Sequence, residues 1–183
     1  MRVLSLSKIK NNLLMWGHYT KNHTGIVIEF NTNYKFFRNL IKISYDNEIP
    51  KLKDSLINDL CLTNTTAREE LRRLFLTKSI HWKYEQEYRF ELSLNHLYRE
   101  FLSSPNNIAL FPQFFKEIKN KNDFVHPYTA PNCINAVYLD VNITEENEKK
   151  IKTLIKTKFP HAKIYRAFLS ENEFKVEFKE IIK

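Results

Sequence analysis

Residues 66–92 (TAREELRRLFLTKSIHWKYEQEYRFEL) contain a change of residue period that determines the expected fold. The first four residues, Thr66 to Glu69, have the form of a capping box, in which a threonine and a glutamate satisfy free amides at the start of a helix. Apolar residues follow at helical spacing: Leu71, Leu74 and Phe75. We therefore expect a helix that ends near Ser79 and is followed directly by a strand.

From Trp82 the period becomes two, which is typical of a strand with one buried face. Apolar or aromatic side chains stand at every second position: Trp82, Tyr84, Tyr88, Phe90 and Leu92. Charged side chains fill the positions between them: Lys83, Glu85, Glu87, Arg89 and Glu91. A helix joined to such a strand indicates an α+β fold.

The rest of the chain extends this pattern. Strands are expected at residues 3–7, 25–30, 41–45, 135–143, 162–169 and 174–182, with 25–30 internal to a sheet because both of its faces are apolar. Helices are expected at residues 51–62 and 145–159, the second capped by Thr144, stopped by Pro160 and buried through Ile151, Leu154 and Ile155. Residues 103–132 contain four of the six prolines and are expected to form a long excursion. Together these elements predict a single α+β domain over residues 1–183, with a mixed, mostly antiparallel sheet flanked by helices.

Composition limits the classes of function. The chain is 43% hydrophobic and 14% aromatic, which argues against disorder. It has no apolar run of the ~20 residues that span a bilayer, and no signal peptide, so a cytoplasmic protein without membrane contact is expected. The isolated Cys61 and Cys133 are expected to be reduced. A formal charge of +8 permits nucleic acid as a partner.

The segment 15–25 (MWGHYTKNHTG) contains both glycines of the chain, Gly17 and Gly25. This placement indicates backbone needs, either a positive φ or close approach by another backbone or a ligand. The functional interpretation is a turn that presents side chains to a ligand pocket. Candidate substrate-binding residues there are Trp16, His18, Tyr19 and His23. The alternative is a tight structural turn, and no metal site is expected because no third ligand has a recognisable spacing.

The segment 82–89 (WKYEQEYR) provides the candidate catalytic residues Glu85, Glu87 and Arg89. On an extended strand they would form a row spaced by ~6.5–7 Å, anchored by the aromatic face, from which Tyr84 is a candidate substrate contact. Two carboxylates in a partly desolvated cleft would take different protonation states, with Arg89 keeping one ionised. The alternative is a solvent-facing or salt-bridged strand without chemistry.

Together, the two segments resemble the bacterial family called domain of unknown function 2971 (DUF2971). The likeness is carried by residues 14–19 (LMWGHY), by His23 and Gly25 before a strand, and by Lys78 with residues 82–89. Members of that family are often found among mobile-element and phage-defence genes, so the resemblance implies a role in phage defence or a toxin system. It also implies a further N-terminal portion that this chain lacks, so a partner protein or a second copy is expected to cover the edge of the strand at residues 3–7.

The Glu85-x-Glu87 pair is similar to the glutamate motif of mono-ADP-ribosyltransferases. That likeness implies NAD as a substrate, with Glu87 catalytic and Glu85 its helper, while the NAD-binding residue expected on an early strand is not identifiable. Two other functions stay open at this point. One is a non-catalytic module that binds nucleic acid or protein, and the other is a metal-dependent nuclease.

Overall fold

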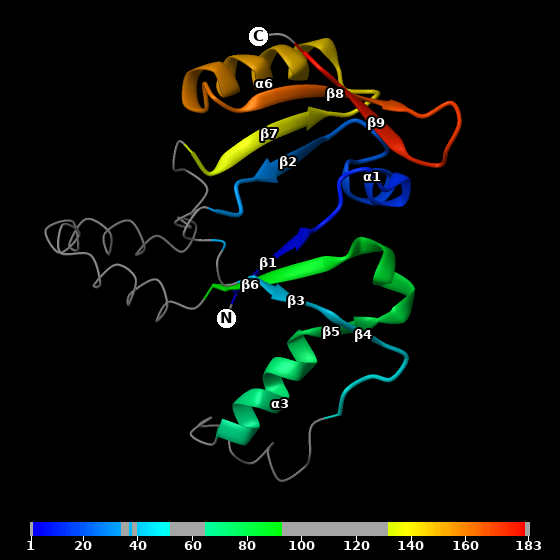
Figure 1. Cartoon of the computed structure of the whole chain (residues 1–183), viewed down its shortest axis with the longest axis vertical. Coiled ribbons are helices and arrows are strands. Elements are labelled where there is room, and N and C mark those ends of the chain that lie inside the picture. Colours follow the sequence, from blue (N-terminus) through cyan, green and yellow to red (C-terminus); the bar gives the residue numbers. More distant parts are fainter. Residues whose placement is uncertain (1, 34–36, 38–39, 52–64, 93–131, 182–183) are drawn as a thin grey trace, which may run out of the picture.

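The computed structural model describes residues 2–33, 37, 40–51, 65–92 and 132–181 (Figure 1). Helices and strands are both present, and most strand pairs are antiparallel, which confirms the predicted α+β class. The described strands form three sheets rather than one, with the orders β2-β7-β8-β9, β1-β6-β3 and β4-β5. No helix in these ranges has both the length and the apolar character needed to cross a bilayer.

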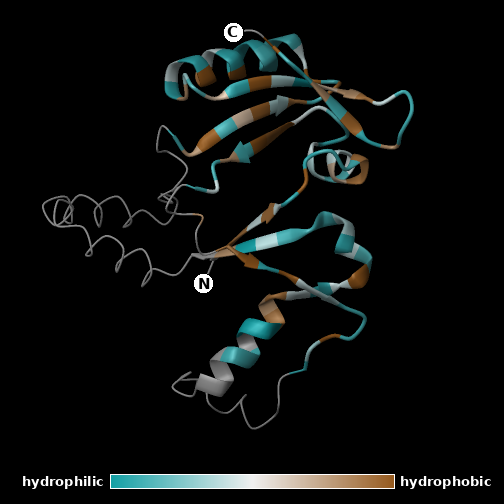
Figure 2. Ribbon diagram, viewed as in Figure 1, coloured by the Kyte–Doolittle hydropathy of each residue, from teal (hydrophilic) through white to brown (hydrophobic). Residues whose placement is uncertain are grey.

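The four-stranded sheet consists of β2 (Ile26–Phe30), β7 (Ile134–Leu139), β8 (Lys163–Leu169) and β9 (Val176–Glu180). The central pair β7 and β8 is parallel, and α6 (Glu145–Lys158) makes the crossover between them and covers one face (Figure 1). Hydrophobic residues mark its strands, whereas α6 is mostly hydrophilic (Figure 2). Ile151 and Ile155 of α6 belong to one apolar cluster with Leu139 and Ile164 of the sheet.

Strand β2 lies at an edge of this sheet among the described strands, so the prediction that it is internal was wrong. Its apolar character has another cause. Ile26 packs in the core beneath α6, while Val27 packs against the cluster around Trp16 on the opposite face. Both faces are thus covered although only one edge is paired.

Helix α6 begins at Glu145 as predicted, because the Thr144 hydroxyl accepts a hydrogen bond from the Asn147 amide at 3.3 Å. It ends at Lys158, one residue before the predicted end, and Phe159 is its C-cap. Ile155 is buried, and Ile151 packs beside it against the sheet. Leu154 is 53% exposed, which corrects its predicted inward position. Residues four apart share the buried face of this helix, and Leu154 lies outside it.

The second sheet contains β1 (Arg2–Ser7), β6 (Glu87–Leu92) and β3 (Ile41–Lys42), with β6 in the middle and both pairings antiparallel. A separate parallel pair joins β4 (Ser44–Asp46) to β5 (Thr77–Ser79). The strand expected at residues 41–45 is thus divided between two sheets. Phe30, Phe37 and Phe90 pack together with Leu4 and Leu6, and this cluster joins the two larger sheets.

Helix α3 (Thr65–Phe75) ends four residues before Ser79, the predicted end of the helix. Residues Thr77–Ser79, which were expected to be helical, instead form β5. The 3-10 helix η2 (Ile80–Glu85) follows, so the prediction that a strand begins at Trp82 was wrong. The Ser79 hydroxyl accepts a hydrogen bond from the His81 amide at 3.4 Å and starts this helix. Gln86 then adopts the left-handed conformation, with a φ of 46°, and only after it does the strand begin.

Residues 15–25 form most of helix α1 (Leu13–Tyr19) and a loop, instead of a single turn. Asn12 caps the helix by accepting a hydrogen bond from the Met15 amide at 3.2 Å. Positive φ angles occur at Lys21, Asn22 and His23 and at neither glycine, which corrects the first explanation offered for the glycines. The second explanation, close approach of another backbone, holds for Gly25.

A methyl group added at Gly25 would lie 2.9 Å from the Thr20 Cβ and 3.0 Å from its carbonyl oxygen. Gly25→Ala should therefore lower the free energy of unfolding by about 1–3 kcal/mol, as overpacking does in a rigid site. At Gly17 the same methyl group would meet only the His23 Nε2, at 3.9 Å. Gly17→Ala is the matched control, and it should be neutral or stabilising because alanine favours helix. Urea unfolding of both variants checks this, and an equal loss in the two would contradict it.

Three predictions concern parts of the chain outside the described residues. These are most of the helix at 51–62, nearly all of the excursion at 103–132, and the state of Cys61. Cys133 is buried in the core of the four-stranded sheet.

Candidate functional site

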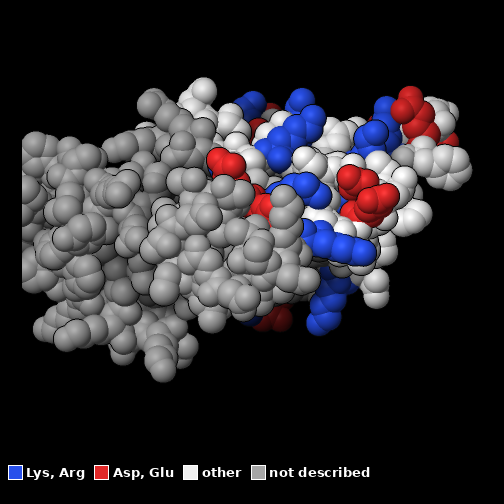
Figure 3. All heavy atoms as spheres, turned by 90° about the horizontal axis from the view of Figure 1, so that it is seen from below, with Lys and Arg blue, Asp and Glu red and all other residues white. Residues whose placement is uncertain are grey.

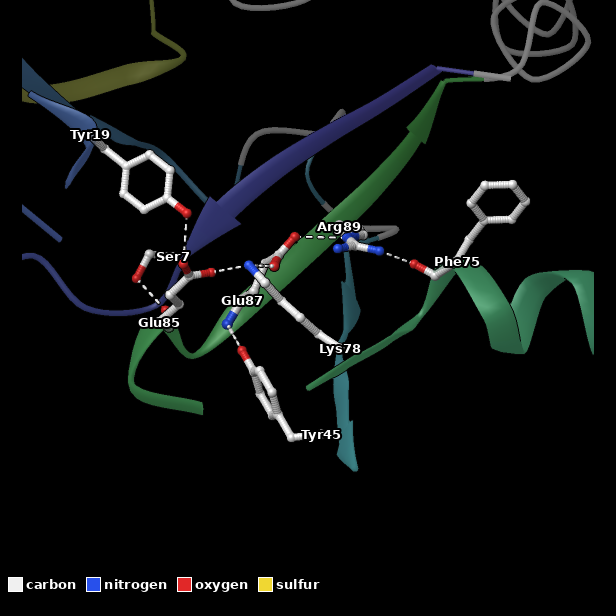
Figure 4. A network of polar contacts seen from close by, with 8 residues as sticks. All are labelled: Ser7, Tyr19, Tyr45, Phe75, Lys78, Glu85, Glu87 and Arg89. Carbon is white, nitrogen blue, oxygen red and sulfur yellow. Dashed lines mark hydrogen bonds and ion pairs between the residues drawn. The ribbon is translucent and has the colours of Figure 1, made fainter. Parts of the chain in front are cut away.

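Two buried carboxylates converge on one ammonium group where the second sheet meets the β4–β5 pair (Figure 4). Lys78 Nζ, from β5, donates to Glu85 Oε2 at the end of η2 and to Glu87 Oε2 at the start of β6, the latter at 3.0 Å. Glu85 is 3% exposed and Glu87 is 5% exposed. Carboxylates this buried are stable as ions only when paired.

The remaining carboxylate oxygens are paired as well. Glu85 Oε1 accepts a hydrogen bond from the Tyr19 hydroxyl at 2.6 Å, and Glu87 Oε1 accepts one from Arg89 Nε at 2.7 Å. The cluster therefore combines one residue from α1 with four from the η2, β5 and β6 region (Figure 4). Two negative and two positive side chains give it a net charge of zero.

Backbone contacts hold these side chains in place. The Glu87 amide donates to the Tyr45 hydroxyl at 2.7 Å, and the Ser7 hydroxyl donates to the Glu85 carbonyl at 2.7 Å. Arg89 also donates to the Phe75 carbonyl at the end of α3. The parallel pairing of β4 with β5 sets Lys78 opposite Tyr45, which brings it to Glu85 and Glu87. Residues from β1, β4 and α3 thus hold the cluster in place.

The hydrogen bonds oppose the effect of burial on acidity. Burial alone would raise the pKa of the Glu87 carboxyl, but donors from Arg89, Ser5 and Lys78 outweigh it and hold that pKa below its ordinary value. Burial disfavours the charged ammonium and would by itself lower the pKa of Lys78, but its two carboxylate partners outweigh burial and raise that pKa. The hydrogen bond to Glu85 is the main cause that raises the pKa of Tyr19 to about 12. Glu87 and Lys78 are therefore both charged at neutral pH.

A pocket of about 430 Å³ lies against this cluster, within the usual size range of ligand sites. Its charged or phenolic wall comprises Tyr19, Lys78, Glu85, Glu87 and Arg89. The remaining wall comprises Ser5, Leu6, Ser7 and Met15. Strand β1 thus forms one side of the pocket and α1 contributes another.

An aromatic group stands beside the cluster. Lys78 Nζ lies 5.0 Å from the centre of the Trp82 ring, and Trp82 is 37% exposed. The His18 ring meets the Trp82 ring edge-on at 6.4 Å, and the Tyr84 ring lies 6.0 Å from it. The Tyr19 side chain is more open, at 61% exposed. These rings border the charged cluster and give it an apolar neighbour.

The structure brings some of the candidate residues together and separates others. Glu85, Glu87, Arg89 and Tyr19 line one pocket, whereas His18 and Tyr84 lie beside it around Trp82. Trp16 is 1% exposed and packs in the apolar cluster on the face of the four-stranded sheet opposite α6. His23 Nδ1 lies 3.3 Å from Asp140 Oδ1, a buried carboxylate at the end of β7.

Sequence reasoning missed the central residue of the cluster. Lys78 was noticed only as part of the family likeness and was given no role. Ser5, Met15 and Tyr45 were also missed. Besides that likeness, the sequence shows only that Lys78 stands seven residues before Glu85, and this spacing indicates no contact until the β4–β5 pairing is known. The described residues form no group of three or more potential metal ligands.

The lowered pKa of Glu87 predicts a dependence of stability on acid. A depressed folded pKa means that the stabilisation is fully present above the unfolded glutamate pKa, ~4.3, and is lost as pH falls through the folded pKa. Wild-type unfolding free energy should therefore fall below pH ~4, and Glu87→Gln should fall less over the same range. Urea unfolding at a series of pH values measures this. The control is Glu146→Gln on the exposed face of α6, and identical profiles for all three proteins would contradict the prediction.

Comparison with known proteins identifies one region. Residues 15–90 match a family model described as "Protein of unknown function (DUF2971)". This range includes α1 from Met15 onward and the whole of the Tyr19–Lys78–Glu85–Glu87–Arg89 cluster, and it confirms the likeness found in the two segments. No curated protein and no solved structure matches the chain.

Proposed function

We propose that the pocket beside Glu85 and Glu87 carries an ADP-ribosyltransferase-like activity on NAD; the family model that residues 15–90 match is described only as of unknown function. The observation that supports this most is the pair of buried carboxylates, Glu85 and Glu87, in the wall of one pocket. A carboxylate at such a position can stabilise the positive charge that develops on a ribosyl group as its leaving group departs. In a cell the activity would serve phage defence or a toxin system.

The reaction breaks the bond between the ribose C1′ and the nicotinamide nitrogen, and the bonding electrons leave with neutral nicotinamide. The ionised Glu87 stabilises the resulting ribosyl oxocarbenium ion. An acceptor hydroxyl, water or side chain then bonds to C1′, and Glu85 takes the proton that the acceptor loses. Arg89 keeps Glu87 ionised and in place, and Tyr19 orients Glu85 through its 2.6 Å hydrogen bond.

The pocket also has groups that suit the rest of NAD. The exposed Tyr19 ring offers a surface on which a planar ring can stack. Lys78 and Arg89 provide positive charge for phosphate oxygens. Basic and acidic side chains are interspersed on the described part of the face in Figure 3, so this view adds no support to a nucleic-acid-binding module. The nuclease reading has no described cluster of metal ligands to support it.

The test is to incubate purified protein with NAD labelled in the nicotinamide ring or in the adenylate, with and without bacterial cell extract. Free nicotinamide, with or without adenylate label on an acceptor, is the expected result. The control variant is Glu29→Gln, because Glu29 likewise accepts from a lysine and a tyrosine, Lys10 at 2.7 Å and Tyr138 at 2.5 Å, outside the pocket. Failure to release nicotinamide under every condition would reject the proposal. Salt-dependent oligonucleotide binding instead would favour the binding module.

A further inference from the structure

The central ammonium of the pocket has the contacts of a bound ligand. Lys78 Nζ touches two buried carboxylates and the face of an indole ring. Paired carboxylates with an aromatic face are the groups that proteins use to hold organic cations. We propose that these groups form a cation subsite of the pocket, that the Lys78 side chain fills it in the free protein, and that a ligand cation replaces it.

The two cations of the cluster differ in how firmly they are held. Arg89 is tied at both ends of its guanidinium, to Glu87 Oε1 and to the Phe75 carbonyl at the end of α3. The contacts of Lys78 are all to the proposed subsite itself, namely Glu85, Glu87 and Trp82. Lysine is a compact charge on a flexible four-carbon stem, so it can withdraw without moving the backbone. Lys78 is therefore the exchangeable cation.

Charge makes the exchange selective for cations. Glu85, Glu87, Arg89 and Lys78 sum to zero, and withdrawal of Lys78 leaves the buried group with a charge of −1. Burying an unpaired carboxylate is costly, so the lysine leaves only when another positive group takes its place. A neutral or anionic ligand at this position would leave the charge unpaired.

A second lysine of the chain shows the same contacts without the pocket. Lys10 Nζ bonds Glu29 and the Tyr138 hydroxyl and lies 4.7 Å from the centre of the Tyr138 ring. Within the described part of the chain, Lys10 pairs with one carboxylate, that of Glu29, whose side chain is 35% exposed. The second, buried carboxylate and the adjoining 430 Å³ of space distinguish the site of Lys78.

The ligand class is a small organic cation with a flat face, which can lie on Trp82 and approach both carboxylates. Two sources of such a cation fit the proposed function, on which this inference rests. One is the pyridinium ring of NAD, and the other is the guanidinium of an acceptor arginine. Binding can be measured without turnover, so the failure of one proposal is separable from the failure of the other.

The test compares wild type, Lys78→Met and the matched control Lys10→Met. Each is titrated with N1-methylnicotinamide chloride and with methylguanidinium chloride at constant ionic strength, by calorimetry and thermal unfolding. Lys78→Met should bind at least one probe about tenfold or more tightly than wild type, because an unpaired buried charge regains a partner. Lys10→Met should bind like wild type, and Lys78→Met/Glu87→Gln should lose the gain. The probe that binds identifies which cation the subsite takes.

The wild-type chain offers a second measurement that does not depend on a variant that folds. If a probe replaces the ammonium, Lys78 becomes free to react with an amine-specific acylating reagent, and its labelling measured by mass spectrometry should rise with probe concentration. Lys10 and Lys163 are internal references. Unchanged labelling of Lys78, together with no gain in affinity for Lys78→Met, would overturn the inference. A lysine with a purely structural role would give that result.

Discussion

Glu87→Gln should lower nicotinamide release from NAD by about 10²–10³-fold, the scale of losing one preorganised electrostatic group. Glutamine keeps the size of the side chain and can still accept one hydrogen bond, but it has no negative charge to oppose that of the ribosyl cation. Arg89 and Lys78 would then face the reacting carbon with their charge less compensated. The loss should appear in kcat more than in KM, because the charge develops only in the transition state.

The comparison with Glu29→Gln makes this result specific. Both variants remove a carboxylate paired with a lysine, but only Glu87 lines the pocket. Circular dichroism and thermal unfolding verify that each variant is folded at the assay temperature. Activity retained in Glu87→Gln, or an equal loss in Glu29→Gln, would contradict the role given to Glu87.

Trp16→Ala should lower the free energy of unfolding by about 3–5 kcal/mol, the cost of removing a large aromatic side chain from a core. Trp16 is 1% exposed and its ring lies 5.9 Å from that of Phe178. Its indole Nε1 also donates to the Lys10 carbonyl at 2.6 Å, so the alanine removes this hydrogen bond as well. Urea unfolding measures the loss directly.

The second tryptophan provides the control for Trp16. Trp82 is 37% exposed, so Trp82→Ala should cost much less stability than Trp16→Ala. Trp16→Phe should fall between wild type and Trp16→Ala, because it restores most of the packing but not the hydrogen bond. A loss of unfolding free energy below about 1 kcal/mol in Trp16→Ala would contradict a core role for Trp16 and favour the substrate-binding role predicted from the sequence.

Elements with their own capping and periodicity could be predicted from the sequence. Thr144 and the spacing of Ile151 and Ile155 were enough to place α6, since these signals act within one or two turns. The division into three sheets could not be predicted, because strand pairing depends on partners far apart in the chain. Strand β2 is an example. Its apolar residues predict that both faces of the strand are covered, but they do not predict whether both of its edges pair with other strands.

Glu85, Glu87, Arg89 and Tyr19 line one pocket, for a structural reason that differs from the predicted one. Glu85, Glu87 and Arg89 were grouped because a strand would align them, whereas Glu85 belongs to a 3-10 helix and meets Glu87 through Lys78. Tyr19 was named because it lies between two rare glycines, and the hydrogen bond that joins it to Glu85 crosses 66 residues. A local sequence pattern cannot predict a contact between residues so far apart in the chain. The role of Lys78 could not be predicted for the same reason, because a parallel strand pair holds it in place.

The left-handed residue between the two glutamates gives the site a dependence on chain length. Before Gln86 the chain is a 3-10 helix with about three residues per turn, and after it the chain is a strand whose side chains alternate every two residues. Gln86 is therefore the single residue at which the direction of successive side chains changes from the helical to the strand pattern. Adding or removing one residue here would turn Glu85 away from Lys78 with every amino acid of the cluster retained. The distance in sequence between the carboxylates is thus as much a part of the site as the carboxylates themselves.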